Sequence, residues 1–281
     1  MTPSGPGFCV MAAEPLLEVD DLGVAFPDGS GGRRVVVDGV SLTVGAGERV
    51  GLVGESGSGK SLTALAILGL TPEPGEIGTG RVMVDGVESS EIAGCRGGVV
   101  GLVLQEAGSA LNPVYSIGYQ LVETIETHGI ARGEAARLRA LELLGEVALE
   151  DPEPIYGAYP HQLSGGQAQR VMLALALAGE PRVIVADEPT TALDLVTQAQ
   201  ILELLGRITD ERNLGLLLVS HDLAVIAQLV HRVVVMHEGR IVEEGRTAEV
   251  LQNPEHPSTR ALVAAAARMR GLHDSANGGV E

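Results

Sequence analysis

The chain has 281 residues, of which 45% are hydrophobic and 38 are glycine, a composition typical of a compact α/β enzyme and not of a disordered chain. Its formal net charge is −18, with 19 Lys and Arg against 37 Asp and Glu, which leaves no basic footprint for a nucleic-acid backbone or an anionic lipid. We therefore expect no nucleic-acid partner, and any membrane contact must run through another protein.

The start of the chain and its apolar segments favour a cytoplasmic protein. The longest apolar stretches, 171–178 and 214–219, are shorter than the roughly 20 residues that cross a bilayer. Residues 1–13 lack the basic start and long apolar core of a secretory signal, so we expect a flexible segment, with Met11 as an alternative start. Two cysteines, Cys9 and Cys95, are too few for a disulfide framework.

The first part of the chain is rich in strand signals. Apolar runs between Leu16 and Val53 alternate with glycine and proline turns, which predicts strands. After Val53 the pattern changes to a glycine loop and a helix over 61–70, which is half of a βαβ unit. Apolar residues spaced near 3.6 predict helices over 115–149. These helices indicate an inserted helical subdomain, at about 107–178.

The chain then returns to the pattern of a parallel sheet. Near-continuous apolar runs at 183–186, 214–219 and 233–236 alternate with helical stretches. The charged stretch Glu243–Arg246 is expected to be a solvated turn. A tail over 251–281 has proline breaks and then an alanine-rich helix to about Arg270.

A glycine-rich segment after Val53 predicts a nucleotide site. It matches G-x-x-x-x-G-K-[ST] and lies between a strand and a helix, as that motif requires. The glycines let the backbone wrap phosphates, Lys60 meets the β- and γ-phosphates, and the Ser61 hydroxyl is a ligand for Mg²⁺. An ordinary βα turn is the alternative. The predicted nucleotide-binding residues of this loop are Gly54, Glu55, Ser56, Gly57, Ser58, Gly59, Lys60 and Ser61.

Two acidic residues follow the apolar run 183–186. Charges at the end of a buried strand cost free energy unless they are paired or bind a ligand. Asp187 is expected to hold Mg²⁺, directly or through water. Glu188, one residue on, is placed to polarise the water that attacks the γ-phosphate. A solvated turn is the alternative for such a pair in isolation.

Three further residues are candidates by their position after predicted strands. Gln105 follows the strand over 99–104 and can reach the metal or the attacking water, although a lone glutamine is more often a surface residue. His221 follows the run 214–219, at the sheet edge where ligands bind in open α/β folds, and can contact the γ-phosphate or hold Glu188. A structural histidine is the alternative. Phe26 can stack on adenine or pack in the core.

A second glycine-rich turn, Leu163–Gln167, opens a predicted helix over 167–178. Its backbone N–H groups and the helix N-terminus offer a surface to another anion, so one chain carries two phosphate-facing surfaces. Downstream, Asp194 is either part of the site or the N-cap of the helix that follows it.

Taken together, these motifs resemble the ATP-binding cassette (ABC) ATPases in order and spacing over most of the chain. The resemblance implies a P-loop NTPase (RecA-like) core with an N-terminal antiparallel β-subdomain, within a nucleotide-binding domain at 14–250. It also implies a head-to-tail dimer in which Ser164 and Gly166 serve the partner's nucleotide and Asp194 links the two sites. The catalytic set is then Glu188, His221, Gln105 and Lys60, with ATP and Mg²⁺.

A narrower resemblance is to ATPases of the oligopeptide, dipeptide and nickel importers. It rests on the residues that fill the loop Gly54–Ser61, on Ala110–Pro113 and Tyr159–Gln162, and on the tail from Asn253 to Leu262. Ala107, Ala168 and Ser258 depart from that pattern and bear on permease docking and tail packing. Some longer relatives bind an iron–sulfur centre through cysteines after this tail; no cysteine follows Cys95 here, so we expect no such centre.

The resemblance implies an ATPase subunit at the cytoplasmic face of the cell membrane, held by permease subunits. A second ABC ATPase subunit, identical or related, and an extracytoplasmic substrate-binding protein complete the expected complex. Peptide is the first expectation for the cargo, with nickel or a metal chelate as the alternative. An exporter ATPase shares the catalytic motifs, and a nucleic-acid-associated ABC ATPase is disfavoured by the acidic balance.

Overall fold

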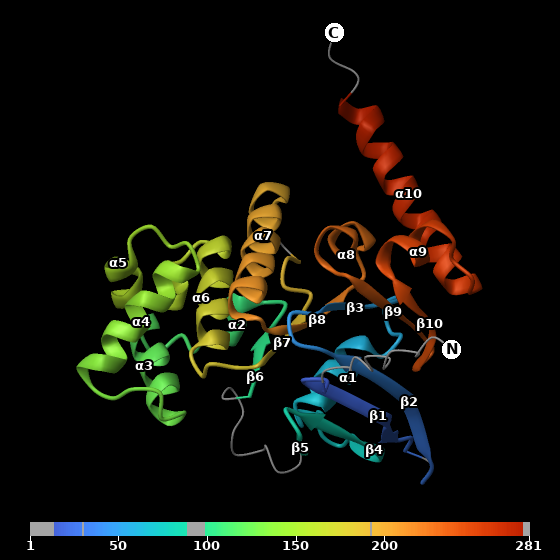
Figure 1. The fold of residues 1–281 in the computed structure, drawn as a ribbon, viewed down its shortest axis with the longest axis horizontal. Coiled ribbons are helices and arrows are strands. Elements are labelled where there is room, and N and C mark those ends of the chain that lie inside the picture. The colour runs from blue at the N-terminus through green and yellow to red at the C-terminus, as the bar shows by residue number, and fades with distance from the viewer. Residues whose placement is uncertain (1–13, 30, 89–98, 192, 278–281) are drawn as a thin grey trace, which may run out of the picture.

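The computed structural model describes residues 14–29, 31–88, 99–191 and 193–277, which form two β-sheets and a group of helices (Figure 1). The expected flexible segment 1–13 and both cysteines lie outside the described residues. One sheet is antiparallel, with the order β2-β1-β4-β5. Its strands are β1 (Leu17–Pro27), β2 (Arg33–Val44), β4 (Glu76–Val84) and β5 (Val87–Glu88).

The second sheet has the order β10-β9-β3-β8-β7-β6 and is parallel except for β10, which pairs antiparallel with β9. Alternate residues of its central strands face the two hydrophobic cores, because side chains alternate along a strand. In β7, Ile184 belongs to one core and Val185 to the other. The strands are β3 (Arg49–Val53), β6 (Val100–Val103), β7 (Val183–Asp187), β8 (Gly215–Ser220), β9 (Arg232–His237) and β10 (Arg240–Arg246).

Helix α1 (Lys60–Ile67) shares a core with strands of both sheets, through buried Ala64, Ala66 and Ile67. Helices α6 (Gly165–Leu177), α7 (Leu195–Arg212) and α8 (Leu223–Leu229) contribute to the other core of the parallel sheet. The parallel sheet is therefore covered on both faces, as its apolar strands require.

The remaining helices between β6 and α6 form a group beside α6 in Figure 1. Leu121 of the first long helix and Leu143 and Leu144 of the second are fully buried and belong to the core shared with α6. The elements are α2 (Ala107–Ala110), α3 (Ile117–Thr127), α4 (Glu134–Glu146), α5 (Pro152–Gly157) and the 3₁₀ turn η2 (Pro160–Gln162).

Two parts of the fold differ from the sequence-based expectations. The stretch Glu243–Arg246 is not a turn but the second half of β10, where its residues pair with β9. The Glu243 carboxylate accepts the backbone N–H groups of Glu255 and His256, which explains a charged strand. In addition, β4 and β5 follow α1 in sequence but join the antiparallel sheet, and the sequence patterns did not predict them.

The tail after β10 contains α9 (Thr247–Gln252) and α10 (Pro257–Asn277), and α10 projects away from the body of the protein (Figure 1). Among the helices that the structure describes, none combines the length and the apolar character needed to cross a membrane.

Candidate functional site

The site begins at the loop between β3 and α1. Gly54 approaches strand β9 so closely that a Cβ atom there would lie 2.1 Å from the Met236 carbonyl oxygen. Gly59, the N-cap of α1, has φ +103°, a conformation that residues with a side chain rarely adopt. The glycines thus allow a tight loop whose backbone N–H groups and following helix N-terminus suit an anion.

Lys60 folds back over this loop. Its Nζ donates to the carbonyl oxygens of Gly54 at 2.9 Å and Glu55 at 2.8 Å, and it lies 3.4 Å from Ser58 Oγ. Burial lowers the pKa of the Lys60 ammonium, while the carboxylates of Glu188 and Asp187 oppose that shift. A buried cation at the mouth of a phosphate-sized loop is suited to bind a phosphate group.

Ser61 and Asp187 bring two oxygen ligands together. Ser61 Oγ donates to Asp187 Oδ1 at 3.1 Å, which joins the start of α1 to the end of β7. Burial raises the pKa of Asp187, and the bond from Ser61 opposes this rise. A hydroxyl and a carboxylate suit Mg²⁺, which prefers oxygen ligands and keeps positions for phosphate and water. Within the described residues no group of three or more His, Cys, Asp or Glu side chains forms a metal site of protein ligands alone.

Glu188 lies beside His221 and Thr191. Its backbone N–H donates to the Val219 carbonyl at 2.9 Å, which fixes the residue against the end of β8. His221 Nδ1 is 2.7 Å from Glu188 Oε1, and Thr191 Oγ1 donates to Glu188 Oε2 at 3.0 Å. Because a neutral imidazole has one N–H, a ring that donates to Glu188 does not at the same time donate to a phosphate. The sequence left two roles open for His221, and the structure favours the one in which His221 holds the Glu188 carboxylate.

Gln105 and Phe26 have different surroundings. Gln105 is exposed and follows β6, at the same carboxyl edge of the sheet as Asp187, because β6 and β7 are parallel. Phe26 is half-buried and packs against the core of the antiparallel sheet. A Cβ atom on Gly75 would lie 2.6 Å from the ring of Phe26, so the ring covers that glycine. These contacts support the packing alternative for Phe26, and its stacking on adenine stays a prediction.

The second glycine-rich turn forms the N-terminus of α6. Ser164 Oγ accepts the Gln167 N–H at 3.3 Å, and Gln167 Oε1 accepts the Ser164 N–H at 2.9 Å, so the two side chains form a capping box. A Cβ atom on Gly166 would lie 2.7 Å from Thr197 Cγ2, so α6 and α7 meet closely at this turn. Glycine is needed here for the approach of α7.

Asp194 is the N-cap of α7, one of the two roles expected from the sequence. Its Oδ1 accepts the N–H groups of Val196 and Thr197 at 3.1 and 3.0 Å, and its Oδ2 accepts the Thr197 hydroxyl at 2.7 Å. The hydrogen bonds from Thr197 lower the pKa of Asp194. Thr197 thus contacts both Asp194 and the turn at Gly166, and places them side by side. The neighbouring side chains of Leu195 and Val196 are exposed.

Sequence reasoning missed Thr191 and Thr197. Each lies three residues after an acidic residue in a turn or a helix cap, a spacing at which a hydroxyl commonly reaches the acid. That local signal could have identified both.

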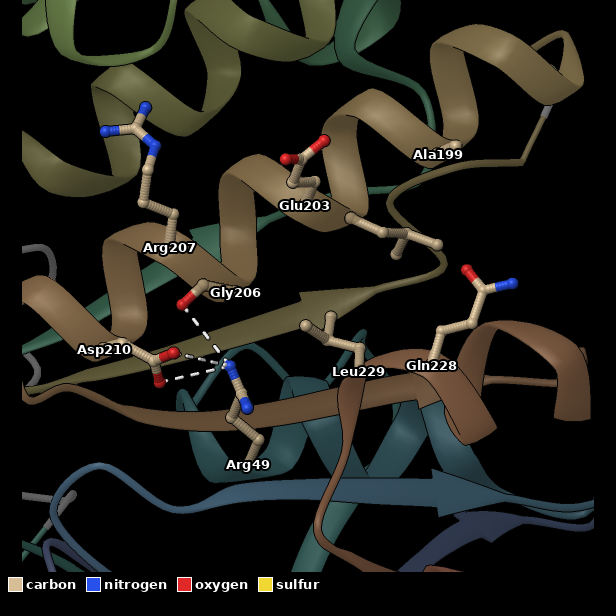
Figure 2. A pocket seen from close by; sticks show the side chains of 9 residues that line it. Arg49, Ala199, Glu203, Gly206, Arg207, Asp210, Gln228 and Leu229 are labelled. Carbon is tan, nitrogen blue, oxygen red and sulfur yellow. Dashed lines mark hydrogen bonds and ion pairs between the residues drawn. The ribbon is translucent and has the colours of Figure 1, made fainter.

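A separate cavity of about 420 Å³ lies between α7 and α8 (Figure 2). Arg49 points into it from the start of β3 and donates to Asp210 at 3.1 Å and to the Gly206 carbonyl at 3.4 Å. Because Arg49 begins β3 and the phosphate loop follows its other end, this cavity is at the opposite edge of the sheet. Its residues do not form part of the site described above.

Comparisons with known proteins agree with this geometry. A family model described as "ABC transporter" matches residues 37–191. The dipeptide transport ATP-binding protein DppD of Escherichia coli is 43% identical over 255 residues, which cover 89% of this chain and 78% of DppD. The peptidoglycan transport ATP-binding protein YejF of Agrobacterium fabrum is 45% identical over 94% of this chain, and the chain spans about half (49%) of YejF.

Solved structures give the same result. A dimeric ATP-binding cassette, in a post-hydrolysis state with ADP and Pi, superposes with a TM-score of 0.71 at 31% identity, over 82% of this chain and 98% of that one. The part of the chain matched by the family model includes both the phosphate loop and the acidic end of β7. The chain therefore belongs to the ABC transporter family, as one of its ATP-binding cassette ATPases.

Proposed function

We propose that this chain is the ATP-hydrolysing subunit of an ABC importer for dipeptides or oligopeptides. The observation that carries the proposal is the convergence of Ser61, Asp187, Glu188 and His221 at one edge of the sheet, next to the loop that holds Lys60. The relatives named for dipeptide and oligopeptide transport support the cargo class.

The chain's own residues divide the work of phosphoryl transfer to water. The loop from Gly54 to Gly59 and the Lys60 ammonium bind the phosphates, and Ser61 and Asp187 would hold Mg²⁺. When bound, the cation neutralises charge on the phosphate oxygens. Glu188 accepts the proton of the attacking water as the water oxygen bonds to the γ-phosphorus, and the bond from that phosphorus to its bridging oxygen breaks to release ADP.

His221 holds the Glu188 carboxylate through Nδ1, 2.7 Å from Oε1. In the proposed dimer, the turn at Ser164 and Gly166 of one subunit faces the γ-phosphate held by the other, and its N–H groups stabilise developing charge. The side chains of Leu195 and Val196, next to Asp194, are apolar and exposed, which supports an interface with the second subunit at this end of α7. A monomer then holds the catalytic side chains but hydrolyses poorly.

The complex also needs a membrane partner. We place the chain at the cytoplasmic face of the membrane, held by permease subunits that work with an extracytoplasmic binding protein. The segment after Gln105 and the helices to about Tyr159 form the proposed cleft for a permease helix. Its support is the exposure of Val114, Tyr115, Tyr119 and Tyr159 in this region, since exposed apolar side chains that gather there suit a partner surface.

The proposal is tested with Glu188→Gln. This variant keeps the shape of the side chain and removes its basicity, so it should bind ATP and form the dimer but hardly turn over. Glu203→Gln is the matched control, because Glu203 lines the separate cavity of Figure 2. This control variant should hydrolyse ATP at the normal rate. Normal steady-state ATPase activity of Glu188→Gln would remove Glu188 from the role of base.

The cargo is tested on the intact complex, purified with its permease. Peptides released from the complex and its binding protein, and uptake of a labelled dipeptide that depends on ATP, would support the peptide assignment. Bound nickel or a metal chelate would replace peptide as the cargo, and ATP-driven movement outward would overturn the importer assignment.

A further inference from the structure

Both carboxylate oxygens of Glu188 are held by side chains of its own chain. His221 Nδ1 lies 2.7 Å from Oε1, and the Thr191 hydroxyl donates to Oε2 at 3.0 Å. The Glu188 side chain is 16% exposed, whereas His221 on its other side is 58% exposed, so the carboxylate is more enclosed than its histidine partner. We propose that Thr191 is a positioning residue, which orients the base of the hydrolytic reaction; the inference rests on the function proposed above.

The backbone around Glu188 is fixed by hydrogen bonds, so the main motion left to this residue is rotation of its side chain. The Glu188 N–H is bonded to Val219 of β8, and the Thr191 N–H closes a turn on the Glu188 carbonyl at 3.2 Å. Glu188 has φ +48°, a left-handed conformation uncommon for a residue with a side chain. The backbone is therefore held in an unfavourable shape by its surroundings, as functional positions often are. What remains is rotation about the side-chain bonds, and the Thr191 hydroxyl opposes that rotation.

The contact leaves the base free to act. A carboxylate oxygen accepts two hydrogen bonds, so each oxygen of Glu188 keeps a position for water after His221 and Thr191 are bound. If the Thr191 bond is lost, Oε2 is free to turn toward the Lys60 ammonium, the nearby cation that Glu188 already influences. A base turned in that way is misplaced for the water, and a displacement of about 1 Å can cost about a hundredfold in rate.

A structural role is the competing explanation, because a threonine hydroxyl can simply stabilise the turn over 188–191. The two roles differ in what they predict for kinetics. A residue that positions the base changes kcat, since the phosphates are held by the loop after β3 and not by this turn. A residue that only stabilises the turn changes the folding stability, and its effect on hydrolysis does not depend on the Glu188 carboxylate.

The first experiment compares Thr191→Val with Thr191→Ser in the full chain. Valine keeps the shape without a donor, and serine keeps the donor. We expect Thr191→Val to lower kcat about tenfold with an unchanged KM for ATP, and Thr191→Ser to stay within about twofold of the parent. Thr209→Val is the control, because that buried hydroxyl donates to carbonyls within α7, at Leu205 and Gly206. Equal kcat values for the valine and serine variants would overturn the inference.

The second experiment places Thr191→Val in a Glu188→Ala background and follows single-turnover hydrolysis. If Thr191 acts through Glu188, its substitution has no further effect once the carboxylate is gone. A further drop by the same factor as in the parent would show a structural role and overturn the inference.

The failures of the two proposals are distinguishable. Full activity of Glu188→Gln contradicts the assignment of Glu188 as the base in the proposed function. An inactive Glu188→Gln together with a fully active Thr191→Val contradicts only the role of Thr191.

Discussion

Substitution of Arg232 by methionine should destabilise the protein by removing a polar link between its two sheets. Arg232 begins β9, and its Nε donates to Glu48 Oε1 at 2.8 Å while Nη2 donates to the Thr43 carbonyl at 2.7 Å. It also pairs with Glu244 of β10. One guanidinium thus ties the parallel sheet to β2 of the antiparallel sheet, beside the start of the strand that leads to the phosphate loop.

The size of the effect follows from these contacts. A hydrogen bond to a charged group contributes about 1.5–3 kcal/mol, and methionine removes the ones to Glu48 and Thr43. The side chains of Arg232 and Glu48 are 20% and 29% exposed, so water replaces part of the loss. We expect the free energy of unfolding to fall by about 3 kcal/mol.

The deficit should depend on pH. Burial raises the pKa of Glu48. The hydrogen bonds from Arg232 and Gly45 and the charge of Arg232 together lower it by more, so the net pKa is below its ordinary 4.5. A carboxyl with a depressed folded pKa contributes stability above its unfolded pKa, and this is lost as pH falls through the folded value. The difference between the parent and Arg232→Met should therefore be full at neutral pH and shrink below about pH 4.5.

Denaturant unfolding at neutral and acidic pH measures both effects, as a shift of the midpoint without a change of slope. Arg240→Met is the matched control, since Arg240 pairs with Asp38 on the surface and is 69% exposed. It should cost less than about 1 kcal/mol. The reasoning is refuted if both variants lose the same stability, or if the Arg232→Met deficit stays constant as the pH is lowered.

Two further predictions concern the helices around α6. Leu143→Ala should lower the free energy of unfolding by about 2–5 kcal/mol, because this side chain of α4 is fully buried in the core shared with α6; a loss below about 1 kcal/mol in denaturant unfolding would contradict this packing. Gly166→Ala should lower ATPase activity while the affinity of the isolated chain for ATP is kept, because its Cβ atom would lie 2.7 Å from Thr197 Cγ2 and push α7 from the turn. Activity at the parent level would show that the turn tolerates the added atom.

Much of the site was predictable because its signals are local. The phosphate loop needs glycines within a few residues of Lys60, and the apolar run that ends at Asp187 is one strand. The capping box of Ser164 and Gln167 is likewise contained in four residues. In each case neighbouring residues supply most of the contacts, so the pattern and the structure coincide.

The elements that the patterns missed depend on distant segments. Most of β4 is exposed and carries little apolar alternation, yet it forms a strand because β1 pairs with it along its length. The charges of Glu243–Arg246 suggested a turn, but pairing with β9 and the N–H groups of Glu255 and His256 stabilise a strand there. A strand of this kind is stabilised by a partner that its own residues do not reveal.

The sequence by itself determined the family and the α/β class, and it predicted the phosphate and acidic residues, because short motifs with strict spacing specify them. Only the tertiary structure decided which side chains meet: His221 and Thr191 at the two oxygens of Glu188, Thr197 between Asp194 and the turn at Gly166, and Phe26 against Gly75. The physical reason is that these contacts join ends of separate strands and helices, whose approach is set by the packing of two sheets around α1 and of the helices around α6.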